Sequence, residues 1–332
     1  MKILVTGCFG FIGFNFLNFL LSKQSGIEEI IGIDKLENTY SLKNKDLTIQ
    51  KDNFKFIQED IVNINELEDD IKDVDAVFNF AAETHVDNSI FNPEEFINSN
   101  ILGTAKLLRF GMENEIENFF HISTDEVYGS STDLYNIESD ILNPSSPYSA
   151  SKASAEMICN SYSKTYGYDV CIIRPANNYG VFQQPEKLIP FSLCKLFSGD
   201  NIEIYGDGKN VRHWLNVDDT VEGIFHLYIN KINNGIYNIG SGEYMENIEL
   251  AKKILEALGL NEDRLSFVKD RPGHDFRYAI NINKITSTGW KPNRKIDKEL
   301  EKIIKWYKDN ENWWKEGMNQ IDENRKKRFN IT

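Results

Sequence analysis

Two neighbouring carboxylic acids follow an apolar stretch near the middle of the sequence, and these residue types could do chemistry. Residues 118–123 are typical of a buried strand, and Thr124, Asp125 and Glu126 come directly after them. A solvated turn would explain the acids, because charged side chains are mostly exposed. In a partly dry site, two neighbouring carboxyl groups push their pKa values apart, so that one serves as acid and the other as base. The acids alone leave both interpretations open.

A second candidate pair lies further along the chain on a predicted helix. Tyr148 precedes Lys152 by four residues, which places both side chains on one face of the helix. A nearby ammonium group lowers the pKa of a phenol, so we expect Tyr148 to act as a base near neutral pH. On an ordinary helix such a pair would carry no meaning, but here Ser123 and Thr124 end a strand that would lie opposite.

The N-terminal glycines indicate a cofactor site. Gly7, Gly10 and Gly13 are spaced as G-x-x-G-x-x-G between a predicted strand at 2–6 and a helix. Glycines let the backbone approach a diphosphate, whose charge then lies at the helix N-terminus. The next strand ends at Asp34, where an acid binds ribose hydroxyls and repels a 2′-phosphate, which favours NAD over NADP. The alternative is a loop that only packs helix on strand.

These residues need a scaffold, and the pattern predicts an α/β fold with a Rossmann-type doubly wound parallel sheet. β-rich runs alternate with helical patterns, which is typical of a parallel sheet covered by helices on both faces. The predicted strands are 2–6, 29–34, 54–60, 76–82, 118–123 and 169–175. The predicted helices are 14–23, 94–114, 149–167, 217–230, 248–260 and 298–310.

The pattern loosens after residue 176, which predicts a smaller mixed α/β C-terminal substrate lobe. We expect an NAD-binding Rossmann domain at 1–176 plus about 213–238. The second lobe would comprise about 177–212 plus 239–332. The boundary is discontinuous because the helix at 217–230, with an Asp as its possible cap, would return to the first lobe.

The composition narrows the class of protein. The 332 residues are 41% hydrophobic and 27% charged, as in a soluble globular protein with a real core. A net charge of −14 repels phosphate backbones, so we expect no nucleic-acid partner. The cysteines and histidines show no ligand spacing, which predicts reduced thiols, a cytoplasmic protein and no metal site. Glycines and asparagines interrupt the apolar stretch 3–21, so no membrane segment is expected.

Together these motifs resemble the extended short-chain dehydrogenase/reductase superfamily, through the TGxxGFIG loop and the YxxxK pair. Within it the chain is most similar to nucleotide-sugar 4,6-dehydratases, and closest to the dTDP-glucose 4,6-dehydratase family. The resemblance runs nearly end to end through 34–36, 79–87, 121–129, 146–154, 177–180, 185–190, 205–215, 237–240 and 270–280. The TDEVYG segment discriminates, because epimerases and decarboxylases of this fold carry other residues there.

The resemblance implies a hydro-lyase that binds NAD tightly and recycles it within each turnover. Tyr148 would take the proton of the sugar 4-hydroxyl while C4 is oxidised, with Lys152 keeping it deprotonated and Thr124 near O4. Glu126 would then remove the C5 proton. Asp125 would protonate the departing C6 hydroxyl, and hydride would return to C6. In this way dTDP-glucose would become dTDP-4-keto-6-deoxyglucose.

The same resemblance assigns binding residues, although each taken singly could be an ordinary surface residue. Those expected at the cofactor are Gly7, Phe9, Gly10, Phe11, Ile12, Gly13, Asp34, Lys35, Asp60, Ile61, Ala81, Ala82, Ser123, Tyr148, Lys152 and Asn178. Those expected at the substrate are Glu83, His85, Thr124, Asn177, Lys187, Leu188, Tyr205, Arg212, Asn247, Arg271 and His274. Tyr205 would stack on the base, and Arg212 would hold the diphosphate.

Several positions depart from the usual pattern of this family. Cys8, residues 37–40 and Asn88 differ without touching a predicted catalytic residue. His213 and Asn216 replace the more usual Asp and Tyr near the predicted base site. UDP-glucose is therefore an alternative to dTDP-glucose as the substrate.

Two rival functions and the oligomeric state complete the expectations. A UDP-sugar 4-epimerase or decarboxylase would share the fold, but the TDE run argues against both. A non-catalytic NAD-binding sensor could dispense with Tyr and Lys, so the intact Tyr148–Lys152 pair argues against it. The resemblance also implies a homodimer formed through helices of the first lobe.

Overall fold

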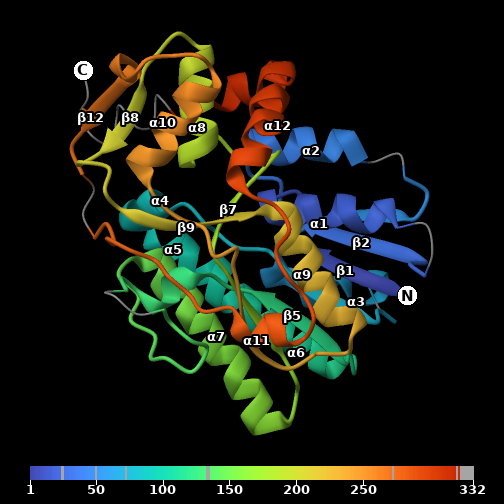
Figure 1. The fold of residues 1–332 in the computed structure, drawn as a ribbon. Coiled ribbons are helices and arrows are strands. Elements are labelled where there is room, and N and C mark those ends of the chain that lie inside the picture. Colours follow the sequence, from blue (N-terminus) through green and yellow to red (C-terminus); the bar gives the residue numbers. More distant parts are fainter. Residues whose placement is uncertain are drawn as a thin grey trace.

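A seven-stranded parallel sheet forms the largest element of the computed structural model, which describes residues 1–23, 26–48, 51–71, 73–131, 135–270, 273–318 and 321 (Figure 1). Its strands lie in the order β10-β6-β5-β4-β1-β2-β3. Their bounds are β1 Lys2–Thr6, β2 Glu29–Asp34, β3 Phe54–Gln58, β4 Ala76–Asn79, β5 Asn118–Ile122, β6 Cys171–Pro175 and β10 Gly235–Ile239. Because every pairing is parallel, the carboxyl ends of the strands meet at one edge.

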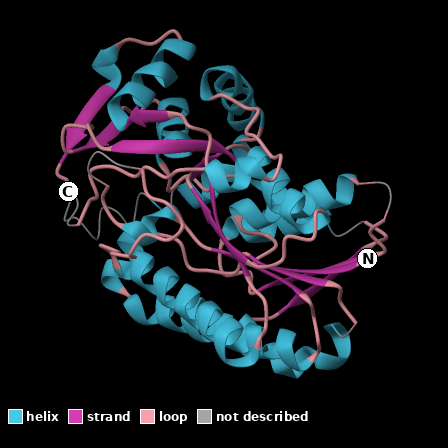
Figure 2. Cartoon of the chain, turned by 60° about the horizontal axis from the view of Figure 1, so that its bottom comes forward, coloured by secondary structure: helices cyan, strands magenta, loops and turns pink. Residues whose placement is uncertain are grey.

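Both faces of this sheet are buried, as the unbroken apolar runs of the strands require. On β1, Ile3 and Val5 pack into one core cluster, whereas Leu4 between them packs into another. The first cluster includes α1 (Phe11–Ser22) and α9 (Val217–Ile229); the second includes η1 (Ile61–Leu67), α6 (Thr104–Glu113) and α7 (Pro147–Tyr166). Figure 2 shows the strands between the two helical layers. The predicted doubly wound fold is confirmed.

The elements differ from the predictions chiefly at their ends. β3 and β4 stop at Gln58 and Asn79, so the residues expected to end them lie in the connections that follow. The single helix predicted at 94–114 is α5 (Pro93–Phe96), a π-helical segment η2 (Ile97–Gly103) and α6. β10 is a strand that the sequence analysis did not predict. The remaining elements near these are α2 (Thr39–Thr48), α3 (Glu68–Ile71), α4 (Val86–Phe91) and the 3-10 helix η3 (Asp125–Tyr128).

Shorter strands and helices cover the carboxyl edge of the large sheet. β7 (Asn177–Tyr179), β9 (Val211–Asn216) and β11 (Tyr244–Glu246) form one small sheet, and β8 (Ile202–Tyr205) pairs with β12 (Leu265–Val268). With them lie α8 (Leu188–Phe197), α10 (Asn247–Ala257), η4 (Glu262–Arg264), α11 (Asn283–Ser287) and α12 (Ile296–Asp309). The aromatic residues Tyr307, Trp313 and Trp314 are buried in their common core.

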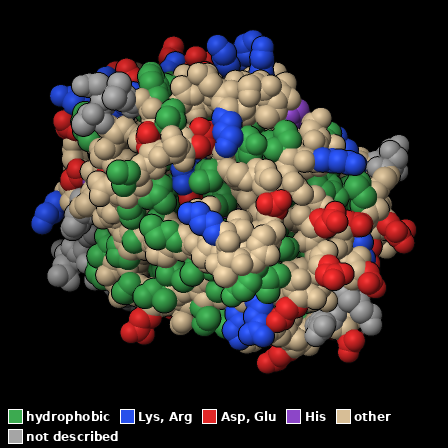
Figure 3. Space-filling view, turned by 90° about the horizontal axis from the view of Figure 1, so that it is seen from below, with side chains coloured by type: hydrophobic (Ala, Val, Ile, Leu, Met, Phe, Trp, Pro, Cys, Tyr) green, Lys and Arg blue, Asp and Glu red, His purple; other side chains and the backbone are tan. Residues whose placement is uncertain are grey.

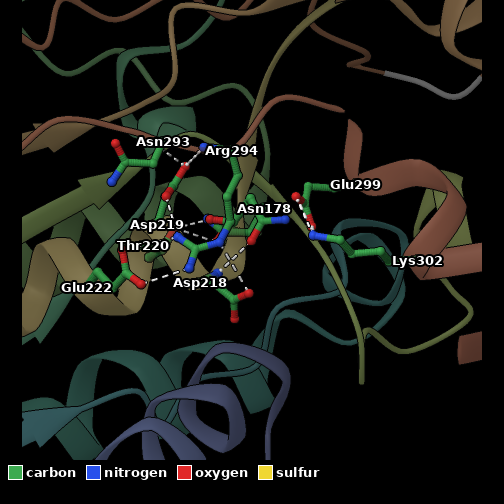
Figure 4. A network of polar contacts seen from close by, with 10 residues as sticks. Asn178, Asp218, Asp219, Thr220, Glu222, Asn293, Arg294, Glu299 and Lys302 are labelled. Atoms are coloured by element: carbon green, nitrogen blue, oxygen red, sulfur yellow. Dashed lines mark hydrogen bonds and ion pairs between the residues drawn. The ribbon is translucent and has the colours of Figure 1, made fainter. Parts of the chain in front are cut away.

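An arginine fastens the segment after α11 to the start of α9 (Figure 4). The Arg294 guanidinium donates to Asp219 at 2.6 Å and to Glu222 at 2.8 Å. Asp219 is fully buried, and its second oxygen accepts from the backbone N–H of Arg294. The helix is capped by Asn216, which accepts from the Asp218 N–H at 2.8 Å, so the predicted Asp cap is wrong. An Asn side chain one residue before the helix satisfies the free N–H equally well.

A buried ion pair joins α7 to β6 in the core of the large sheet. Arg174 on β6 and Glu156 on α7 are 2% and 0% exposed, with Nη2 and Oε2 2.5 Å apart. Arg174 also donates to the Tyr128 hydroxyl at 2.5 Å, and that hydroxyl donates to Asn238 on β10 at 2.8 Å. The network therefore connects the strands β6 and β10 with the helix α7 and with the end of η3.

We expect Glu156→Gln to lower the free energy of unfolding by about 3–5 kcal/mol, because it leaves a buried guanidinium without its counter-charge. Chemical denaturation measures the change. Glu113→Gln is the matched control, since it breaks an ion pair with Arg109 whose side chains are 49% and 61% exposed. That control should change the free energy of unfolding by less than about 0.5 kcal/mol. Equal losses in the two variants would contradict the importance of the buried pair.

Candidate active site

A cavity of about 690 Å³ lies along the carboxyl edge of the large sheet, in the range typical of small-molecule sites. It is lined by residues that follow β1, β2, β4 and β5 and by residues of β7, β8 and β9. Almost every residue that the sequence analysis assigned to a site lines it. The exceptions are Phe9, whose ring is fully buried in the core, and Arg271, which lies outside the described residues.

The glycine loop places an uncapped helix N-terminus at this cavity. Gly7 has a positive φ of 63°, and a Cβ there would lie 2.6 Å from the backbone nitrogen of Ala81. Gly10 precedes α1, and no side chain caps its first N–H groups. Free N–H groups and the helix dipole favour an anion at this position. The loop therefore fits the diphosphate of a dinucleotide.

The end of β2 supplies the acid that was predicted to hold a ribose. Asp34 accepts from the Phe9 N–H at 3.0 Å and from the Leu36 N–H at 2.9 Å. Each oxygen keeps a lone pair that a hydroxyl can use. Lys35 beside it forms ion pairs with Glu37 at 2.6 Å and Glu83 at 2.9 Å. Glu83, predicted at the substrate, is thus held at the cofactor side.

The two acids lie on the first turn of η3, immediately after β5. Thr124 caps this turn, with its hydroxyl accepting from the Glu126 N–H at 3.2 Å. Asp125 is 2% exposed, and its Oδ2 has no partner among the described residues. Burial, and then the charge of Glu126, raises the pKa of Asp125 well above its ordinary value. A solvated turn is therefore the wrong interpretation for Asp125, because its side chain is buried and its protonated form is favoured.

The tyrosine and lysine lie on the first turns of α7, which begins with Pro147 and a capping box between Ser146 and Ser149. We expected Lys152 to lower the pKa of Tyr148, and the structure shows the opposite. Burial raises the pKa of Tyr148, and the charges of Glu126 and Asp125 raise it further. The Lys152 ammonium instead donates to the Ile122 carbonyl at 2.6 Å. Burial lowers the pKa of Lys152 to about 8, against the opposing effect of Glu156.

Several buried polar atoms in the cavity wall have no partner within the described protein. They are Ser123 Oγ, Asn88 Oδ1, Asn177 Oδ1, Asn247 Oδ1, Tyr40 Oη and Trp214 Nε1. A buried polar group without a hydrogen bond is unfavourable, so these atoms indicate a polar ligand. The sequence analysis missed Tyr40 and Trp214. Strand alternation could have found Trp214, two residues after Arg212 on β9, whereas no sequence signal gives the orientation of Tyr40.

The residues predicted for the nucleotide end are held in place by their neighbours. The Arg212 guanidinium donates to the carbonyls of Val211 at 2.9 Å and Asp275 at 3.0 Å. It also lies over the Tyr278 ring, 4.5 Å from its centroid. His274 pairs with Asp270 at 2.7 Å. This packing fixes a cation at the cavity wall, where it can meet a diphosphate.

Three other predicted residues take part in local contacts. Lys187 Nζ donates to the Thr84 carbonyl at 3.1 Å, directly before Leu188 begins α8. His85 caps α4 by accepting from the Asn88 N–H at 3.2 Å. Asn178 accepts from the Thr220 hydroxyl at 2.6 Å, which joins β7 to the α9 network (Figure 4).

The two departures expected near the base do not line the cavity. His213 is fully buried, and its Nε2 accepts from the backbone N–H of Ser241 at 2.9 Å and of Gly242 at 2.8 Å. Asn216 caps α9. Both side chains hold the backbone, so neither contacts a ligand in the cavity directly.

The described part of the chain shows no group of three or more His, Cys, Asp or Glu side chains arranged for a metal ion. None of its described helices has the length and apolar character needed to cross a membrane.

This chain combines a parallel sheet with a glycine loop and a Tyr–Lys pair, which together define the class of dinucleotide-dependent Rossmann-fold proteins. Within this class, the acid pair points to a smaller group of proteins. The family model for GDP-mannose 4,6 dehydratase matches residues 4–303, and the chain belongs to this family. Agl12, a low-salt glycan biosynthesis protein of Haloferax volcanii, is 40% identical over 92% of this chain and 98% of its own. A dTDP-glucose 4,6-dehydratase of Streptomyces niveus is 38% identical over 95% of both chains.

A solved structure agrees with these relatives. DesIV, a dTDP-glucose 4,6-dehydratase from Streptomyces venezuelae crystallised with NAD bound, superposes with a TM-score of 0.91. It is 38% identical, and the match covers 95% of this chain and 99% of DesIV. The resemblance to nucleotide-sugar 4,6-dehydratases found in the sequence is confirmed.

We expect Asp125→Asn to raise thermal stability more at high pH than at low pH. The unfolded aspartate ionises near pH 4, whereas the raised pKa keeps the folded carboxyl protonated. Between these two pKa values the folded state binds more protons, so the parent loses stability as pH rises. Asparagine cannot ionise, so the Tm difference should widen by roughly 2 °C per pH unit as the pH rises from about 4 toward the raised pKa of the folded carboxyl. Thermal unfolding at several pH values measures this, and a constant difference would contradict the raised pKa.

Proposed function

We propose that this protein catalyses the NAD-dependent 4,6-dehydration of a nucleotide sugar. The observation that carries the proposal is the buried Asp125 beside Glu126, opposite Tyr148 and Lys152 in one cavity. An elimination of water needs one group that donates a proton and one that accepts a proton. The relatives that are named dTDP-glucose 4,6-dehydratases support the same reaction.

The chain's own residues would move protons at three sugar positions. When bound, oxidised NAD supplies the hydride acceptor and a positive charge that favours the Tyr148 phenolate. Tyr148 takes the O4 proton, beside a Lys152 that is charged below about pH 8. The resulting 4-ketone acidifies the C5 proton, and Glu126 removes it. Asp125 gives its proton to the C6 hydroxyl, which leaves as water.

The remaining steps balance the reaction. Hydride returns to C6, a proton returns to C5, and the product is a 4-keto-6-deoxy sugar nucleotide. The Thr124 hydroxyl lies between the acid turn and Tyr148, where it can orient O4. The glycine loop, Asp34 and Asn178 would hold NAD, and Arg212 with Lys187 would hold the sugar nucleotide.

We infer dTDP-glucose as the substrate, with UDP-glucose as the alternative. The named relatives favour dTDP-glucose. His213 and Asn216, which left the nucleotide open, do not line the cavity, so they do not favour UDP-glucose.

Product mass tests the reaction. Incubation with dTDP-glucose should give a product lighter by one water, faster than with UDP-glucose. Glu126→Gln is the control, because it keeps Tyr148 and Lys152 but removes the base: it should reduce water loss by at least about a hundredfold, the usual contribution of a general base. An unchanged mass with both sugar nucleotides would sink the proposal. Loss of carbon dioxide from a UDP-hexuronate would instead identify a decarboxylase.

We further infer a homodimer and the two-lobe division predicted from the sequence. Exposed apolar side chains lie on α4, η2 and α7, and both α4 and η2 pack against α7. They are Ile90, Phe91, Ile97, Leu102, Met157 and Tyr166. Figure 3 shows apolar side chains grouped on the face seen from below, where Figure 1 places α6 and α7. A second copy of the chain would cover this surface.

The four free, buried cysteines support a cytoplasmic protein.

A charge on this surface should separate the dimer. We expect Ile97→Glu to sediment as a monomer, because a charge in an apolar interface loses its hydration without a partner. Phe267→Glu on β12 is the control, since Phe267 is 57% exposed and Ile97 is 53% exposed. The homodimer proposal is wrong if the parent protein sediments as a monomer or if both variants remain dimers.

A further inference from the structure

The helical residues 311–318, which follow α12, pack against α2 beside the glycine loop. Figure 1 places α12 next to α2, although they come from opposite ends of the chain. Lys43 on α2 donates to the carbonyls of Asn312 at 2.5 Å and Trp313 at 3.3 Å. The C-terminal segment therefore reaches the part of the sheet that presents the cofactor loop.

A hydrogen-bond relay runs from this segment to the loop itself. Trp313 Nε1 donates to Asn44 Oδ1 at 2.9 Å, and Asn44 Nδ2 donates to the Phe9 carbonyl at 3.0 Å. Asn44 is fully buried. An indole can only donate and a carbonyl can only accept, so the amide has one possible orientation. Loss of the indole N–H would leave the Asn44 oxygen unsatisfied in the core.

The relay fixes the loop from the side away from the cavity. The Phe9 N–H is already bound to Asp34, so both polar groups of Phe9 are held. Gly10 follows at once and precedes the uncapped N–H groups of α1. The position of these N–H groups toward a diphosphate therefore depends on Asn44 and, through it, on Trp313.

The same segment packs against Tyr40, a residue that lines the cavity. The Tyr40 ring packs on Trp313 with centroids 4.9 Å apart, and a Cβ on Gly317 would lie 2.3 Å from the Tyr40 hydroxyl oxygen. Tyr40 is 5% exposed, lines the cavity, and its hydroxyl has no partner in the described protein. Its helix starts shortly after Asp34, on the cofactor side.

We propose that residues 311–318 complete the NAD site. Trp313 and Asn44 are positioning residues for the glycine loop, and Trp313 with Gly317 holds Tyr40 at the cavity wall. The C-terminal segment thus sets how long the protein retains its cofactor. This goes beyond the proposed reaction, because it concerns cofactor binding and is tested without turnover.

Two neighbouring tryptophans give a matched test. Trp314 is 1% exposed and donates its indole N–H at 2.7 Å to Tyr307, within its own lobe. We expect Trp313→Phe to release NAD about tenfold faster, and Trp314→Phe within about twofold of the parent, because one unsatisfied buried group weakens the site by about that factor. Both variants should lower the Tm of the protein. The release rate is measured by following NAD freed from the purified holoenzyme into an NAD-consuming trap.

Equal release from both variants, or release from Trp313→Phe at the parent rate, would overturn the proposal. If Trp313→Phe does not fold, 3-benzothienylalanine at position 313 keeps the ring shape and lacks only the N–H.

Discussion

The buried ion pair between Arg174 and Glu156 is the constraint that ties the fold to the chemistry. Glu156 lies one helical turn after Lys152 and opposes the lowering of the lysine pKa by burial. Arg174 holds Tyr128, the last residue of the 3-10 turn that carries the acids. Arg174 therefore positions both halves of the site: a shift of the helix would leave a charge unpaired in the core, and a shift of the turn would break the buried hydrogen bond to Tyr128.

The cavity edge shows how a parallel sheet concentrates polar groups. Its strands are buried on both faces, so polar side chains collect where the strands end. There the Ser123, Asn177 and Asn247 oxygens have no partner within the described part of the chain, although buried polar groups elsewhere are mostly paired. This arrangement lowers the stability of the ligand-free protein and prepares it for a polar ligand.

The sequence predicted the parallel sheet, the glycine loop and the acid pair, because each rests on local spacing. It could not predict where β3 and β4 end, since strand ends depend on pairing with neighbours. It was wrong about the direction of the Tyr148 pKa, because burial and the nearby acids raise it, while the Lys152 ammonium is bound to the Ile122 carbonyl. The role of His213 in binding the backbone at Ser241 could not be predicted either, because it depends on a loop that is distant in the sequence.

The acid turn is anchored at both ends. The Ser123 N–H continues the ladder to Ile173 at 2.7 Å, and a Cβ on Gly129 would lie 2.1 Å from the Asn143 carbonyl. Between these anchors, a residue gained or lost would exchange the positions of the proton donor Asp125 and the proton acceptor Glu126. Its side chains remain replaceable. Divergence into new sugar chemistries on this frame is therefore open to substitution at 124–126 and closed to insertion or deletion there.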